Sequence, residues 1–111
     1  MQTSSYYRQG TLTVRFCGEL DHFAAAAALE AVESAAEEYM PRTCILDFSE
    51  MSFMDSSGIA VLLRSERMLQ HSGCGIRISG CNAQVRRVLE LSGMQDWIAD
   101  DRHIRKECEL L

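Results

Sequence analysis

The sequence predicts a single α/β domain with a small, mixed and mostly parallel sheet, opened by a β-hairpin and packed against three to four helices. Of the 111 residues, 47% are hydrophobic and 24% charged, which is globular composition with enough apolar residues for one core. Runs of strand length alternate with helical patterns in the order ββαβαβα, and a strand that returns after a helix is usually parallel to the previous strand. We place the domain at residues 1–111 and its core at about 11–98, and leave 99–111 unassigned.

Two strands begin the chain. Residues 11–17 read T-L-T-V-R-F-C, in which every second side chain is apolar, as in a strand with one buried face. Residues 5–8 form a short partner strand, and Gln9-Gly10 supplies the turn of the hairpin.

A helix then runs from Asp21, a favourable N-cap residue, to about Met40. Five consecutive alanines favour helix, and Pro41 ends it because proline disfavours helical backbone in the residue before it. Four glutamates between residues 30 and 38 make one face acidic. The predicted core face contains Phe23, Ala27, Leu29, Val32, Ala35 and Tyr39.

Residues 43–48 form a short apolar strand parallel to 11–17, and residues 49–54 connect it to the second helix. That helix spans about 56–71, with Asp55 as its N-cap and Ser72-Gly73 at its end. Residues 75–79 alternate as another strand.

Asn82 caps a third helix, in which apolar residues between 85 and 91 recur at helical spacing, and Ser92-Gly93 ends it. Residues 94–98 are expected to form a short edge strand, and residues 102–111 a small final helix.

The candidate site lies in the three loops 18–23, 48–57 and 80–82. Loops that follow parallel strands meet at one edge of a sheet, where helix N-termini also point. This topology brings Asp21, Asp55 and Asn82 to the same end of the domain.

Composition excludes several classes of function. The net charge is -5, and the chain has no run of Lys or Arg that would neutralise nucleic-acid phosphates. No apolar window is long enough to cross a membrane, and the first residues do not resemble a signal peptide. Five cysteines without a C-x-x-C pair indicate reduced thiols and a cytoplasmic protein.

Neither an enzyme nor a metal or cofactor site is expected. The M-D-S-S-G sequence at 54–58 lacks the G-x-S-x-G frame of a hydrolase and the lysine of a P-loop, and only His22 could serve Ser56 as a base. Metal sites need three or four converging ligands, whereas His71 with Cys74, and His103 with Cys108, are pairs on separate elements.

Residues 54–58 indicate a serine that can carry a phosphate. Ser56 and Ser57 occupy the first turn of a helix whose free backbone N–H groups favour an anion by about 0.3–1 kcal/mol. Gly58 removes a side chain from the approach to this turn. Alternatively, Asp55 only caps the helix and the serines tolerate its first turn.

The sequence G-E-L-D-H at 18–22, followed by M-D-S-S-G at 54–58, resembles the STAS-domain anti-sigma-factor antagonists of bacteria over about residues 12–97. The resemblance implies that the unphosphorylated protein binds an anti-sigma factor serine kinase and so releases the sigma factor. It also implies that phosphorylation of Ser56 abolishes this binding and that a serine phosphatase restores it. The residues expected to contact the partner are Asp21, His22, Asp55, Ser56, Ser57 and Gly58.

A second hypothesis keeps the fold without the switch. In it, the chain is a constitutive STAS scaffold in a signalling assembly, or an accessory subunit of a membrane-transport complex. The intact D-S-S-G sequence favours the switching hypothesis. For that role we expect a cytoplasmic protein that is monomeric when free and exposes one edge to a larger partner.

Overall fold

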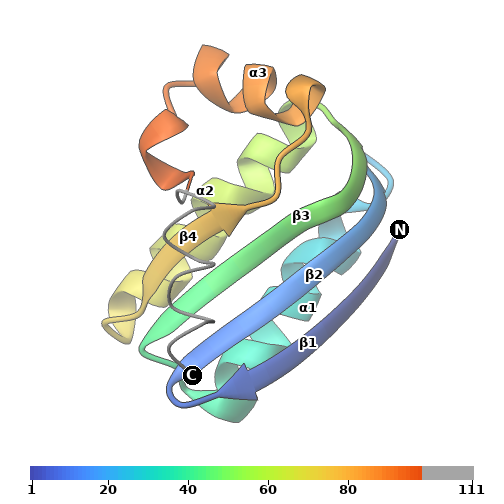
Figure 1. The fold of residues 1–111 in the computed structure, drawn as a ribbon. Helices are drawn as coiled ribbons and strands as arrows, with labels where there is room; N and C mark the ends of the chain where they lie inside the picture. The colour runs from blue at the N-terminus through green and yellow to red at the C-terminus, as the bar shows by residue number, and fades with distance from the viewer. Residues whose placement is uncertain (99–111) are drawn as a thin grey trace.

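The computed structural model describes residues 1–98, which form a four-stranded mixed sheet with two helices on one face (Figure 1). The strand order is β1-β2-β3-β4. Strand β1 (Gln2–Arg8) is antiparallel to β2 (Thr11–Leu20), whereas β2, β3 (Thr43–Met54) and β4 (Gly75–Ser79) are parallel. The predicted fold class and element order are confirmed.

The predicted hairpin is present, and its turn uses Gln9 and Gly10, both with left-handed backbone at φ 51° and 85°. Two such residues give a turn whose twist matches that of the flanking strands. Strand β1 begins at Gln2, earlier than predicted. All its residues are exposed and it is held by backbone pairing with β2, so its side chains give no alternating apolar pattern that would reveal a strand. Tyr7 of β1 stacks on Tyr39 with ring centroids 5.0 Å apart, which joins the hairpin to the first helix.

Strand β3 is twice as long as predicted, and residues 49–54 belong to it rather than to a loop. The β2–β3 register shifts between Arg15 and Cys17 and again between Gly18 and Glu19. These irregularities change the spacing of buried residues from two to three after Phe48, where Met51 and Met54 follow. The two-residue alternation that identifies a strand therefore stops at Phe48 although the strand continues.

The first helix, α1 (Ala25–Tyr39), begins four residues after the predicted cap at Asp21. Its buried residues are Ala28, Val32 and Ala35, and the same spacing continued backwards reaches Ala24 and Ala25. Phe23 and Ala27 lie outside this stripe and are exposed, so the prediction that they belong to the core was wrong.

The remaining helices begin where the caps predicted. Helix α2 (Ser56–His71) has Asp55 as its N-cap, and α3 (Ala83–Leu91) has Asn82. Residues 94–98 contain the 3-10 turn η1 (Gln95–Trp97) and a single bridge from Ile98 to β4, so an edge strand was the wrong prediction. The final helix predicted at 102–111 lies outside the described residues.

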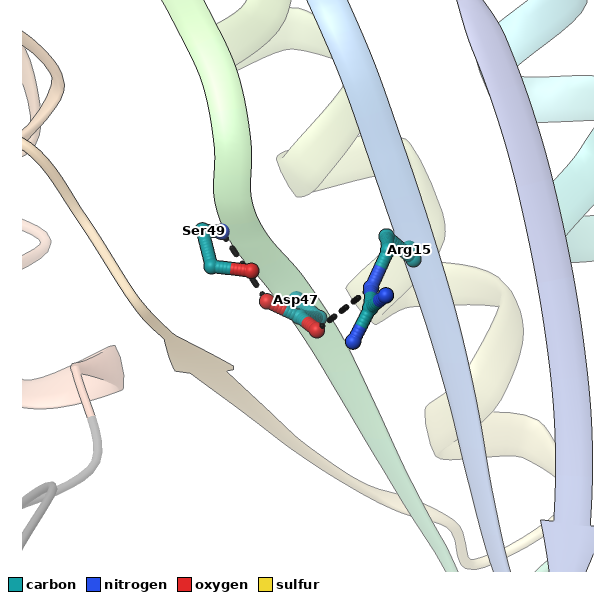
Figure 2. A network of polar contacts seen from close by, with 3 residues as sticks. All are labelled: Arg15, Asp47 and Ser49. Atoms are coloured by element: carbon teal, nitrogen blue, oxygen red, sulfur yellow. Dashed lines mark hydrogen bonds and ion pairs between the residues drawn. The ribbon is translucent and has the colours of Figure 1, made fainter.

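The core lies between the sheet and helices α1 and α2, and the opposite face of the sheet carries a polar network (Figure 2). Asp47 Oδ2 accepts a hydrogen bond from Arg15 Nε at 3.0 Å, and Asp47 Oδ1 accepts one from the Ser49 backbone N–H at 2.9 Å. Partial burial raises the pKa of Asp47, but the bonds from Ser49 and Arg15 outweigh it and lower the pKa overall.

Gly80→Ala is expected to destabilise the protein more than Gly73→Ala. Both glycines have left-handed backbone, with φ of +76° and +74°, so each alanine carries strain of about 1–2 kcal/mol. A Cβ at Gly80 would lie 2.8 Å from the Ser49 backbone nitrogen, whereas nothing lies within 4 Å of one at Gly73. We expect overpacking to cost Gly80→Ala about 1–3 kcal/mol more in urea unfolding. Equal losses in the two variants would contradict the close packing of Gly80 on Ser49.

Asp47→Asn is expected to lower the free energy of unfolding at pH 7 by about 0.5–1 kcal/mol, since the ion pair is solvent-screened. A carboxyl whose pKa is lower in the folded state stabilises the fold above its unfolded pKa. The difference between wild type and variant should therefore shrink as the pH falls below 3.8 and through the folded pKa. Chemical unfolding at a series of pH values measures this difference. A difference that stays constant down to acid pH would show that the carboxylate charge is not the cause.

Candidate functional site

The loop after β2 is a turn held by Asp21. One carboxylate oxygen of Asp21 accepts hydrogen bonds from the backbone N–H groups of Phe23 and Ala24, both at 3.0 Å. Asp21 therefore caps this turn, and the prediction that it caps the helix itself was wrong, because α1 starts at Ala25 with no side-chain cap. The turn leaves the side chains of His22 and Phe23 exposed.

The second loop places Ser56 at the start of α2. Asp55 Oδ1 accepts a hydrogen bond from the Ser57 backbone N–H at 2.9 Å, as an N-cap residue does. Ser56 is exposed and Ser57 is half-buried. The backbone N–H of Asp55 points to the carbonyl of Leu20 at 3.4 Å, which sets this loop beside the Asp21 turn.

Gly58 is buried, so the absence of a side chain there does not open an approach to the helix turn, as the sequence suggested. The structure shows another reason for glycine at this position. A Cβ at this position would lie 2.5 Å from Cγ of Met54 and 3.2 Å from Cδ2 of Leu20. Met54 and Leu20 are themselves fully buried. Glycine therefore lets the first turn of α2 pack directly against the ends of β2 and β3.

The third loop holds the end of β3 from the other side. The Asn82 side chain accepts a hydrogen bond from Val85 N–H and donates one to the carbonyl of Met51, both at 2.9 Å. Gln84, which the sequence analysis missed, binds both backbone groups of Met54: its Oε1 accepts from N–H at 3.0 Å and its Nε2 donates to the carbonyl at 2.9 Å. These residues thus position the segment that leads into Asp55 and Ser56.

A hollow of about 310 Å³ lies between α1 and α2 next to these loops. His22 and Ser57 line it together, although they are far apart in the sequence, and Arg64 supplies a positive charge. The other lining residues are Ala25, Ala26, Leu29, Ala60 and Val61. The structure therefore brings Asp21, Asp55 and Asn82 to one end of the sheet, as the topology predicted, and His22, Ser56 and Ser57 lie on the same loops.

The described part of the chain contains neither a candidate metal site nor a helix that could span a membrane. Within residues 1–98, no three His, Cys, Asp or Glu side chains gather where a metal ion could bind. His71 and Cys74 are in this part, and His103 and Cys108 lie outside it. Over the same residues, no helix has both the length and the apolar character needed to cross a membrane.

Comparison with known proteins identifies the fold. The STAS domain family model matches residues 3–109. The anti-sigma F factor antagonist of Paenibacillus polymyxa is 29% identical over 94 residues, which cover 85% of this chain and 80% of that protein.

The same class of protein appears among solved structures. Unphosphorylated SpoIIAA, an anti-sigma factor antagonist, matches with a TM-score of 0.80 and 26% identity over 99% of this chain and 98% of its own. The Bacillus cell fate determinant SpoIIAA in its phosphorylated form matches with a TM-score of 0.70 and 26% identity over 95% and 98%. Since the family model spans nearly the whole sequence and the structure has the SpoIIAA arrangement of sheet and helices, this chain belongs to the STAS domain family.

Proposed function

We propose that this chain is an anti-sigma factor antagonist whose binding edge is controlled by phosphorylation of Ser56. The observation that carries the proposal is the exposed Ser56 at the first position of α2, beside Asp55 and next to the Asp21 turn. The names of its relatives support the role, since both the Paenibacillus polymyxa protein and SpoIIAA are anti-sigma factor antagonists.

Ser56 is the better phosphate acceptor of the two adjacent serines. Its side chain is exposed, whereas Ser57 is half-buried and lines the hollow between α1 and α2. Successive residues on a helix point about 100° apart, so a kinase that approaches one serine directly does not approach the other along the same direction. Exposure therefore favours Ser56.

The switch acts through charge while the fold is kept. A phosphate adds about 1.5–2 negative charges, and the N-terminus of a helix accommodates an anion well. The same charge falls beside the carboxylate of Asp55 and near that of Asp21, on the edge that would meet the partner. A partner that fits the unmodified edge is then repelled, and a loss of about 3 kcal/mol weakens binding about 100-fold.

The proposed partners are an anti-sigma factor that is also a serine kinase, and a serine phosphatase that removes the phosphate. The names of its relatives support a regulatory role for the chain, and the proposal assigns it no catalysis of its own. The residues proposed to contact the partner remain Asp21, His22, Asp55, Ser56 and Ser57. Gly58, the sixth residue predicted there, is buried and would instead act by letting α2 pack against Leu20 and Met54.

A cytoplasmic location is part of the proposal. Cys17, Cys44 and Cys74 are free thiols, and burial raises the pKa of Cys44 to about 12, with a further contribution from Cys74. A thiol with so high a pKa stays protonated and unreactive at neutral pH. Reduced, partly buried thiols of this kind suit the reducing cytoplasm.

Ser56→Asp is expected to weaken binding to the anti-sigma factor kinase about 100-fold, because it places a fixed charge on the edge. Ser56→Ala should bind as the wild type does, since it removes only a hydroxyl. Titration calorimetry with the purified kinase measures the three affinities. Ser34→Asp is the matched control, because Ser34 is exposed on α1 outside the three loops and the same added charge there should leave the affinity unchanged. Equal affinities for wild type, Ser56→Ala and Ser56→Asp would refute the charge mechanism.

A phosphate is expected on Ser56 in the protein isolated from its own cells while phosphatases are inhibited. Intact mass should show a single added phosphate, and peptide mapping should place it on Ser56. Phosphate on Ser57 would overturn the assignment made from exposure. Unmodified protein in every growth and stress condition would instead favour the constitutive scaffold.

A further inference from the structure

Phe23 is the most exposed large hydrophobic residue in the described part of the chain, at 92% exposure. It stands in the turn between β2 and α1, whose backbone is fixed by two hydrogen bonds to Asp21. His22 packs edge-on against it, with ring centroids 5.7 Å apart and an interplanar angle of 72°. A rigid turn thus holds an aromatic ring in water, although burying such a ring yields about 1.5–3 kcal/mol.

The surroundings of Phe23 are acidic. A hollow of about 420 Å³ beside it is lined by Met1, Glu19, Asp21, Phe23 and Ala24. Phe53, a second exposed aromatic residue at 39% exposure, is the register partner of Glu19 across β2 and β3. The edge therefore presents an apolar ring with carboxylates around it, and Ser56 lies on the neighbouring loop.

We propose that Phe23 anchors the partner, inserting into an apolar pocket whose rim carries Arg or Lys side chains. This inference rests on the proposed function and specifies the chemistry of that partner. Aromatic residues dominate binding energy when they fill a pocket at the centre of an interface. Basic side chains complement Glu19 and Asp21, and residues 1–53 as a whole carry Arg8, Arg15 and Arg42 against eight acidic residues.

The anchor and the switch are separate parts of one surface. Phe23 supplies affinity through burial, which phosphorylation leaves unchanged, whereas Ser56 sets the charge that the basic rim meets. The side chain of Phe23 makes no contribution to the core, so its removal tests binding without loss of the fold. Asp21 cannot be used in this way, because it holds the turn.

The test measures the affinity of each anti-sigma factor kinase encoded in the same genome, purified singly, for four forms of this protein. These forms are wild type, Phe23→Ala, Phe23→Leu and Met40→Ala. Met40 is 78% exposed at the far end of α1, so Met40→Ala removes a similar apolar side chain away from the edge. We expect Phe23→Ala to weaken binding about 30-fold, Phe23→Leu to restore part of the loss, and Met40→Ala to bind as the wild type does. Unfolding curves should be alike for wild type and Phe23→Ala.

The basic rim is tested with Glu19→Gln, which should lower the association rate and its dependence on salt. An association rate and salt dependence equal to those of the wild type would contradict a basic rim on the partner.

Other outcomes separate this inference from the proposed function. If the wild type binds a kinase and Ser56→Asp does not, but Phe23→Ala binds fully, the anchor is wrong and the proposed function stands. If the wild type binds none of the kinases, the proposed function fails and the anchor fails with it. Sedimentation of the free protein gives a third result: a dimer that Phe23→Ala dissociates would make a second copy the occupant and overturn the partner proposed here.

Discussion

The site depends on hydrogen bonds that fix the carboxyl end of β3 from both sides. Gln84 binds both the N–H and the carbonyl of Met54, and Asn82 binds the carbonyl of Met51. On the other side, the Asp55 N–H points to the Leu20 carbonyl. Because Met54 directly precedes Asp55 and Ser56, these contacts set where α2 begins. The position of Ser56 is thus a consequence of how three loops are joined.

Close packing below the site gives it a rigid base. The first turn of α2 approaches Leu20 and Met54 so closely that a Cβ at residue 58 would force the Met54 side chain to move. Packing therefore limits which residue fits on the buried side of the edge, whereas its exposed side carries the charged groups. This division lets the surface change chemically without disturbing the core.

Most features set by neighbouring residues were predictable from the sequence, with the Asp21 turn as an exception, whereas features set by distant contacts were not. The caps at Asp55 and Asn82 and the turn at Gln9-Gly10 each involve a few consecutive residues, and all were found. The extension of β3 depends on bulged pairing with β2, and the role of Gln84 depends on a partner 30 residues away. Such contacts leave no periodic signal in the sequence. Phe23 was misplaced because the core face at the start of the first helix was assigned one residue out of phase, to Phe23 and Ala27 in place of Ala24 and Ala28.

The Asp21 turn determines how the edge presents both its charge and its exposed ring. A helix starting there would have used the Asp21 carboxylate as an ordinary cap, and even then Phe23 would lie outside the buried stripe of Ala28, Val32 and Ala35. In the structure, the carboxylate is occupied with two backbone N–H groups and the ring points into water. The same aspartate therefore supplies negative charge near Ser56 and holds an apolar group beside it. In the switch proposed here, a phosphate at the start of α2 adds charge beside the turn, and the two hydrogen bonds that hold the turn do not involve Ser56. The proposed switch therefore requires no change of fold, because the partner would meet one shape with two different charges.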